Sequence, residues 1–136
     1  MTSLFSRAIC TVLAAFVPVL TGCNRQSGTA EPDPLYIMLT QNGGACQQNG
    51  SDGVIDAWQG RPVIYQGAAT LSEFQVQFTD CPFASCPVNS PNGISVNIGK
   101  PRPDTAGRIF TYSGLRIDHQ ECRDLGQMGL RVRSGP

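Results

Sequence analysis

The sequence is poor in the residues from which catalytic and metal sites are usually built. It contains one histidine (His119), one tryptophan (Trp58) and one lysine (Lys100) among 136 residues. Its cysteines never occur as Cys-x-x-Cys, the spacing of thioredoxin-like redox motifs. Serine and cysteine nucleophiles leave no local motif either. We therefore expect a protein that is not an enzyme and that needs no cofactor.

Charge of one sign and long apolar segments are also lacking. The formal net charge is zero at pH 7, and no basic patch carries interleaved aromatic residues, which argues against a nucleic-acid partner. No segment after residue 20 is long and apolar enough to cross a bilayer as a helix. Long segments with the 3.6-residue period of amphipathic helices are missing as well.

The N-terminal segment has the features of a signal peptide. Arg7 is its only charged residue, and residues 8–20 form an apolar run of 13 residues. As a helix this run would span roughly 20 Å, less than the hydrocarbon core of a bilayer. Pro18 also interrupts its last turn. A basic start followed by a short apolar core and small residues predicts a cleaved segment over residues 1–22.

The sequence Leu20-Thr21-Gly22-Cys23 resembles the lipobox of bacterial lipoproteins, in which an aliphatic residue and two small ones precede a cysteine. The resemblance implies cleavage after Gly22 and attachment of diacylglycerol to the Cys23 thiol, followed by acylation of the new amino group. Each buried methylene contributes about 0.8 kcal/mol, so two or three acyl chains anchor a protein durably. Residue 24 is Asn and not the Asp that retains lipoproteins at the inner membrane of enteric bacteria. The resemblance therefore implies the periplasmic face of the outer membrane.

Removal of 22 residues leaves 114, which suits one domain. Cys23 and a polar stretch with Pro and Gly, residues 23–34, predict a lipidated residue followed by a flexible tether. Residues 35–136 then form a single β-rich periplasmic domain.

Four cysteines remain after the anchor, and export places them in an oxidising compartment. We expect two disulfides, with Cys81–Cys86 closing a local loop and Cys46–Cys122 joining distant segments. The pairing Cys46–Cys81 with Cys86–Cys122 stays open at this point. A zinc site is the rival interpretation, but a Cys-x4-Cys spacing and a lone histidine do not favour it.

Short apolar or alternating segments predict about eight strands. They lie at residues 35–40, 53–58, 62–65, 74–78, 94–98, 108–112, 115–118 and 129–133. We expect the first of these strands, residues 35–40, to be buried on both faces. Gln59-Gly60-Arg61 and Ser113-Gly114 each suit a hairpin, and residues 68–72 and 121–127 are the only places for a helical turn.

These segments, with 15 glycines and 10 prolines in the chain, predict an all-β fold. We expect a small antiparallel sandwich or barrel that is stapled by the two disulfides.

Three places are candidate binding sites. A disulfide between Cys81 and Cys86 would present Phe83 on a rigid tip, and rigid loops lower the ordering cost of binding. Folding of Phe83 into the core is the equal alternative. Arg116, Arg131 and Arg133 would form one outward arginine face if their strands are neighbours. Trp58 reads as a core residue, with an interface anchor as the alternative.

The function we expect is a membrane-anchored, non-enzymatic module that binds a periplasmic or envelope protein. Envelope assembly and inhibition of, or immunity to, a periplasmic toxin are the two roles considered. The alternative is a lipoprotein that binds a small molecule, a glycan or a metal through Asp118, His119 and Glu121, the densest polar cluster. An exposed histidine at a strand end explains that cluster without any ligand.

Overall fold

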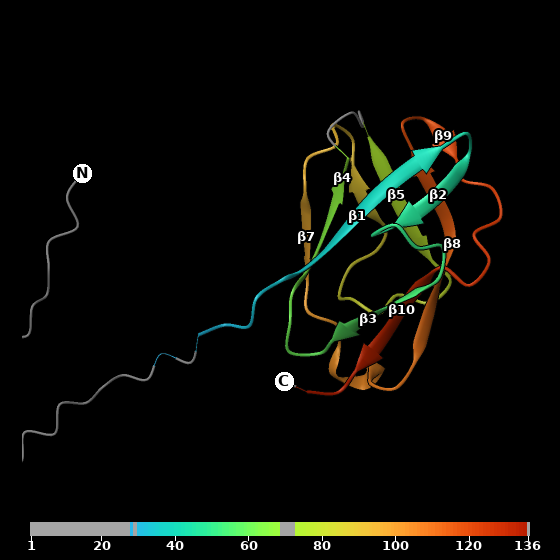
Figure 1. The fold of residues 1–136 in the computed structure, drawn as a ribbon. Coiled ribbons are helices and arrows are strands. Elements are labelled where there is room, and N and C mark those ends of the chain that lie inside the picture. The colour runs from blue at the N-terminus through green and yellow to red at the C-terminus, as the bar shows by residue number, and fades with distance from the viewer. Residues whose placement is uncertain (1–27, 29, 69–72, 136) are drawn as a thin grey trace, which may run out of the picture.

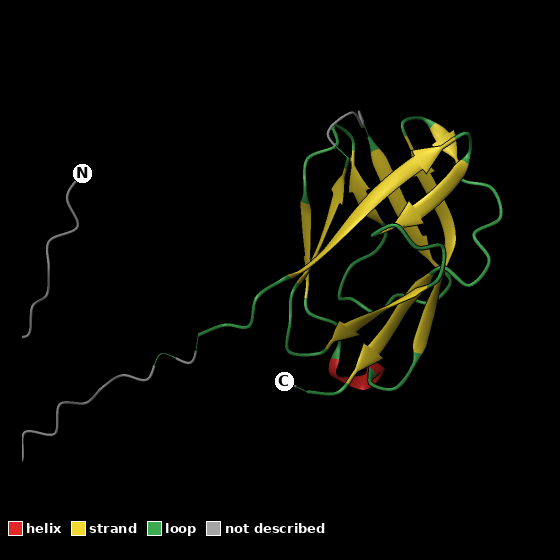
Figure 2. Ribbon diagram, viewed as in Figure 1, coloured by secondary structure: helices red, strands yellow, loops and turns green. Residues whose placement is uncertain are grey.

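The fold consists of two β-sheets that face each other across one core (Figures 1 and 2). It was analysed in a computed structural model that describes residues 28, 30–68 and 73–135. The strands in these residues are β1 (Leu35–Asn42), β2 (Ala45–Gln48), β3 (Val54–Trp58), β4 (Val63–Gly67), β5 (Phe74–Phe78), β6 (Val88–Ser90), β7 (Val96–Gly99), β8 (Ile109–Ile117), β9 (Gln120–Glu121) and β10 (Gly129–Arg133). A 3-10 turn, Pro103–Thr105, precedes β8.

One sheet has four strands in the order β2-β1-β4-β7. The other has six, in the order β3-β10-β8-β5-β6, with β9 paired to β8. Most neighbours are antiparallel, but β1 and β4 are parallel and so are β3 and β10. The predicted all-β class is confirmed, with ten strands in the described residues where about eight were expected.

The core is filled by alternate residues of both sheets. Its largest fully buried side chains include Tyr65, Phe74, Phe83 and Phe110. The strand predicted at residues 74–78 behaves as expected, since Phe74 and Val76 are buried and Phe78 packs against the core. Among the described residues, the core side chains and both disulfides lie between Leu35 and Arg133.

Both predicted disulfides are present, with the favoured connectivity. Cys46–Cys122 joins β2, at the edge of the four-stranded sheet, to the segment that follows β9 in the other sheet. Beside it the Arg123 N–H donates to the Gly44 carbonyl at 3.1 Å. Cys81–Cys86 closes a short loop between β5 and β6. The first disulfide therefore ties the two sheets together, and the second is local.

The end of the predicted tether contacts the domain. The Glu31 carboxylate pairs with Lys100 at 3.1 Å, and Arg61 Nε donates to the Asp33 carbonyl at 2.7 Å. The Leu35 N–H donates to the Pro62 carbonyl, which begins the β1–β4 pairing. Glu31 and Asp33 thus contact the domain through one ion pair and one hydrogen bond, both exposed.

The hairpin predicted around residues 59–61 is wrong. The Arg61 N–H does close a turn on the Trp58 carbonyl, but β3 and β4 belong to different sheets. β3 pairs with β10, whereas β4 pairs with β1 and β7. The hairpin was expected from the length and glycine content of residues 59–61, whereas alternation along a strand says only which side chains point inward. It does not say from which of the two sheets they point, because both sheets face the same core.

The second predicted hairpin, at Ser113-Gly114, is also wrong, because residues 109–117 form the continuous strand β8. The register opposite β5 shifts there: Gln77 faces Gly114 and Phe78 faces Tyr112. One extra residue therefore sits in β8 as a bulge. The bulge lets Tyr112 and Leu115 point to the same side although three positions separate them. The apolar residues on both sides of it are buried, as expected.

Two smaller expectations also fail. β1 is buried on one face only, since Tyr36 and Met38 are exposed. Residues 121–127 hold no helical turn, and most of the other candidate, residues 68–72, lies outside the described residues. The real hairpin turn beyond β8 is Asp118-His119, where both residues have positive φ angles (51° and 64°). Such angles are typical of two-residue turns between antiparallel strands.

Candidate functional site

The outer face of the four-stranded sheet carries no charged side chain. Alternation along its strands directs Ile37, Leu39, Val63 and Tyr65 into the core and the intervening residues outward. The outward residues of β1, β2, β4 and β7 are Tyr36, Met38, Thr40, Asn42, Ala45, Gln47, Ile64, Gln66 and Asn97. We call this surface the uncharged face.

Tyr36 and Met38 are the most apolar exposed residues of the uncharged face. Their side chains are 51% and 41% exposed. In the parallel pairing of β1 with β4, Tyr36 lies beside Ile64 and Met38 beside Gln66. These four side chains thus form a contiguous patch across two neighbouring strands.

Asn49 holds this part of β1 in place from the side. β2 pairs with β1 only from Leu39 onward, so the Tyr36–Met38 edge has no strand beside it. Asn49 Nδ2 donates to the Tyr36 carbonyl at 3.0 Å, and its Oδ1 accepts from the Met38 N–H at 2.7 Å. Its own N–H donates to the Met38 carbonyl at 2.8 Å. Asn49 thereby makes the hydrogen bonds that a neighbouring strand would make, and it fixes the backbone of Tyr36 and Met38.

Shallow hollows flank the patch at both ends of the sheet. One of about 190 Å³ lies among Thr40, Asn42, Ala45 and Gln47, where β1 meets β2. Another of about 400 Å³ lies near Pro34, Pro62 and Asn97, beside the Glu31–Lys100 ion pair. The uncharged face is therefore a broad, gently contoured surface, which suits a large partner better than a small ligand.

Ion pairs gather on the opposite sheet and its connecting loops. Asp56 on β3 forms ion pairs with Arg131 and Arg133 on β10, at 3.8 and 3.1 Å. Glu73, just before β5, pairs with Arg116 at 3.1 Å, and Asp80 pairs with Arg108. The contrast between the two sheets was not visible in the sequence, because the strands of the two sheets are interspersed along the chain.

The predicted arginine face is only partly present. Arg131 and Arg133 lie side by side on β10 and share Asp56. Arg116 does not join them: Arg131 faces Ile109 across the β10–β8 pairing, seven residues from Arg116 along β8. That separation is roughly 23 Å at about 3.3 Å per residue. The strands are neighbours as required, but the register places Arg116 at the other end of the sheet.

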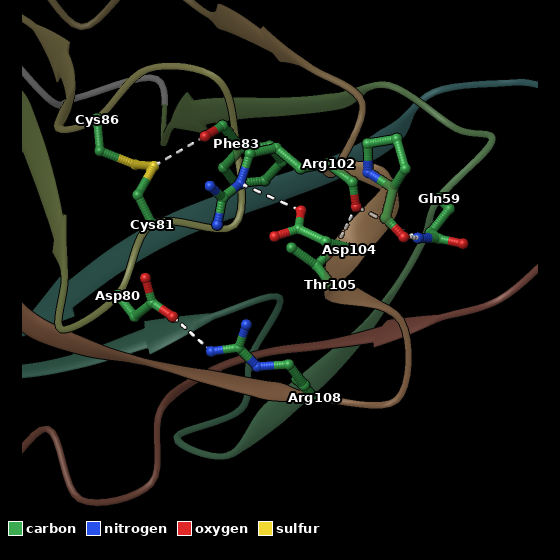
Figure 3. Close-up of polar contacts among 10 residues, drawn as sticks. Gln59, Asp80, Cys81, Phe83, Cys86, Arg102, Asp104, Thr105 and Arg108 are labelled. Carbon is green, nitrogen blue, oxygen red and sulfur yellow. Dashed lines mark hydrogen bonds and ion pairs between the residues drawn. A yellow bond between two sulfur atoms is a disulfide. The ribbon is translucent and has the colours of Figure 1, made fainter.

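Phe83 is not an exposed contact residue. Its side chain is 2% exposed, and its ring packs edge-on against Phe78 with centroids 5.9 Å apart. The Cys81–Cys86 loop folds over it (Figure 3). The Arg102 N–H donates to the Pro82 carbonyl at 2.8 Å. The disulfide-closed loop is thus a structural corner, because burial of an aromatic ring outweighs its exposure at a tip.

Gln59 and Thr105 fix the segment on which this corner rests (Figure 3). Gln59 Nε2 donates to the carbonyls of Arg102 and Pro103 at 3.2 and 2.6 Å. Thr105, which is fully buried, donates its hydroxyl to the Arg102 carbonyl. These bonds join the β3–β4 connection to the 3-10 turn, and they account for a cluster of polar residues without a ligand.

The cluster of Asp118, His119 and Glu121 lies at the β8–β9 turn, beside Glu73 and Arg116. His119 Nδ1 lies 3.0 Å from Glu73 Oε1, which also accepts from Arg116. Glu121 is on β9, with Arg116 as its partner across the β8–β9 pairing. Among the described residues no group of three His, Cys, Asp or Glu side chains is placed to hold a metal ion. Glu73, which the sequence did not single out, organises this region.

Two other predicted positions complete the account. Trp58 is half-buried on β3, opposite Arg133 of β10, so it is neither a full core residue nor a free anchor. Cys23 and the lipobox lie outside the described residues.

Comparison of the chain with protein-family models, with curated proteins and with solved structures finds no match in any of the three.

Proposed function

We propose that this chain is a bacterial lipoprotein, lipidated on Cys23, that acts as a non-enzymatic protein-binding module at the periplasmic face of the outer membrane. Its docking surface is the uncharged face. The proposal leaves two roles for the module: an envelope assembly factor, or an inhibitor or immunity protein. The lipobox-like Leu20-Thr21-Gly22-Cys23 supports the anchor. Within the described residues, no helix is long and apolar enough to cross a membrane.

The observation that carries the binding role is the composition of the uncharged face. Centres of protein–protein interfaces are depleted in charged residues and enriched in tyrosine, other aromatics and methionine. Tyr36 and Met38 stand exposed beside Ile64 on a surface whose other outward residues are small or carry amides and hydroxyls. A partner with an uncharged, partly apolar surface would fit it without leaving any charge buried and unpaired.

The rigidity of the surface also favours binding. β1 is held by β2, β4 and Asn49, and the Cys46–Cys122 disulfide ties β2 to the other sheet. A surface that is already ordered loses little conformational freedom when a partner docks. Methionine adds local adaptability, because its unbranched side chain adjusts to an irregular surface.

Site-specific photo-crosslinking in the native host tests the docking surface. A photoreactive phenylalanine analogue replaces Met38 in one variant and Gln77, exposed on β5 of the other sheet, in the control. We expect a discrete protein adduct from position 38 and none from position 77. Equal adducts from both faces, or adducts with lipid alone at position 38, would contradict the proposal.

Replacement of the lipidation site tests the anchor separately. The Cys23→Ser chain should appear in the soluble periplasmic fraction, whereas the wild-type chain should fractionate with outer membranes and incorporate labelled palmitate. A wild-type chain that remains soluble and unlabelled would remove the lipoprotein part of the proposal. It would leave the docking surface to be judged by the crosslinking result.

A further inference from the structure

Three asparagines of the chain are followed directly by glycine: Asn42, Asn49 and Asn92. Asparagine in this position is prone to lose its side-chain amide, because a glycine lets the next backbone nitrogen approach the side-chain carbon closely. The sequence does not rank the three pairs. Solvent access does not rank them either, since all three asparagines are exposed. Their hydrogen bonds do.

The side-chain amide of Asn49 is held on both sides. Its Nδ2 donates to the Tyr36 carbonyl at 3.0 Å, and its Oδ1 accepts from the Met38 N–H at 2.7 Å. Both bonds must break before the side-chain carbon can turn towards the nitrogen of Gly50. The fold therefore protects Asn49 from this reaction.

Asn92 is restrained more weakly. Its Oδ1 accepts from the Ile94 N–H, and the Gly93 N–H donates to the Ser90 carbonyl, both at 3.4 Å. These distances are at the long end of hydrogen bonding, so they hold Asn92 less firmly than the shorter bonds hold Asn49.

Asn42 has neither kind of restraint. No described residue forms a hydrogen bond with its side-chain amide, and the Gly43 N–H donates to no described backbone group. Asn42 is the last residue of β1, and its pairing with Ala45 is the terminal pair of the β1–β2 hairpin. The ends of a strand pair open at the lowest cost in free energy, and opening here lets the Asn42 side chain turn towards the Gly43 nitrogen.

We propose that Asn42 is a site of spontaneous deamidation in the folded protein, with Gly43 supplying the attacking nitrogen. That nitrogen forms a bond to Asn42 Cγ and gives its proton to solvent, and Nδ2 takes a proton from water and leaves as ammonia. The product is a cyclic imide. Water then adds to one of the two imide carbonyl carbons and opens the ring, which leaves aspartate or isoaspartate at position 42. The net change is one amide and one water converted to one carboxylic acid and one ammonia.

The reaction puts a negative charge on a surface that has none. Asn42 is an outward residue of the uncharged face, on the same side of β1 as Tyr36 and Met38. An aspartate side chain is ionised at neutral pH, and a charge that is buried in an interface without a partner is costly. Deamidation thus weakens docking as the protein ages. This consequence rests on the function proposed above, whereas the reaction at Asn42 does not.

Incubation of the purified protein in water labelled with heavy oxygen, followed by peptide mass spectrometry, measures the reaction at each asparagine. The label enters only those sites that react during the incubation. The same chain in denaturant is the control, because there the fold restrains none of the three pairs. Asn42→Gln is the matched variant, since its longer side chain keeps the amide but closes a ring much less readily.

We expect Asn42 to react at least tenfold faster than Asn49 in the folded protein, and the two to react at similar rates in denaturant. Label at position 42 should be absent from the Asn42→Gln chain. Equal rates at Asn42 and Asn49 in the folded protein, or reaction of Asn42 in denaturant only, would overturn the proposal.

Asn42→Asp tests the effect on docking through the crosslinking assay at position 38. We expect this variant to give at least threefold less protein adduct, whereas Asn92→Asp, outside the uncharged face, should leave the yield unchanged. An unchanged yield with Asn42→Asp would overturn the effect on docking. If the chain without either substitution gives no adduct, the docking function itself fails, and the labelling experiment still decides whether Asn42 deamidates.

Discussion

The hydroxyl groups of Tyr65 and Tyr112 lie 2.9 Å apart and form a hydrogen bond across the core, from β4 of one sheet to β8 of the other. The Tyr112 hydroxyl donates to Gln48 Oε1 at 2.5 Å. Gln48 Nε2 donates in turn to the carbonyls of Gly53 and Gly129, at 2.7 and 2.8 Å. This chain of bonds satisfies three polar side chains that are almost fully buried, and it links both sheets.

Tyr112→Phe should lower the free energy of unfolding by about 1 to 3 kcal/mol, because it leaves the buried Gln48 Oε1 without a donor. Tyr65→Phe should cost less, about 1 kcal/mol, since Tyr112 keeps its bond to Gln48. Urea denaturation followed by tryptophan fluorescence measures both. Equal losses in the two variants would mean that Gln48 is satisfied by another group.

Stability should fall above pH 10. Burial raises the pKa of Tyr65 and Tyr112 well above the usual value of 10.0, with their mutual contact adding to the effect on Tyr65. Below pH 10 both tyrosines are neutral in the folded and unfolded states. Above it the unfolded chain loses protons that the folded chain keeps, so each buried tyrosine removes about 1.4 kcal/mol per pH unit.

Denaturation curves between pH 8 and pH 11 test this pH dependence. The Tyr65→Phe/Tyr112→Phe double variant is the control, and it should lose less stability over the same range. Identical slopes for the double variant and wild type would show that other groups dominate the alkaline loss.

The Cys46–Cys122 disulfide should stabilise the domain more than Cys81–Cys86 does. Their sequence separations are 76 and 5 residues. In the chain-entropy model the long closure contributes about 4.5 kcal/mol and the short one about 2 kcal/mol. Unfolding of the two paired Cys→Ala variants measures the difference. A larger loss of stability on removal of Cys81–Cys86 would mean that this disulfide stabilises the domain through packing around Phe83 and not through chain entropy.

Gly129→Ala should be severely destabilising. A Cβ at Gly129 would lie 2.1 Å from the Phe110 carbonyl oxygen and 2.8 Å from Thr111 Cα, both in the backbone of β8. Neither atom moves without disturbing the β8–β10 pairing, so we expect a loss of at least about 3 kcal/mol. At Gly53 the nearest atom is Ser51 Oγ at 3.4 Å, and Gly53→Ala should change stability by less than about 1 kcal/mol. Thermal melting of both variants separates the two cases.

The candidate surface was not predicted from the sequence, because alternation describes one strand at a time. The run at residues 35–40 contains five apolar residues and reads as buried on both faces. Tyr36 and Met38 are amphipathic or adaptable side chains, and they tolerate exposure where isoleucine and leucine are placed inward. The absence of charge from the whole outer face appears only when β1, β2, β4 and β7 are assembled into one sheet.

The residues themselves determined the all-β class, the positions of most strands, the inward side chains of β5 and the presence of two disulfides among the four described cysteines. Local signals carry this information: period-two alternation, turn residues, and an even number of thiols expected in an oxidising compartment. Tertiary structure alone decided that β3 and β4 separate into opposite sheets and that Arg116 lies far from Arg131. Packing between segments that are distant in the sequence decides which strands pair. The pattern of inward residues does not decide it, because the inward residues of either sheet fit the same core.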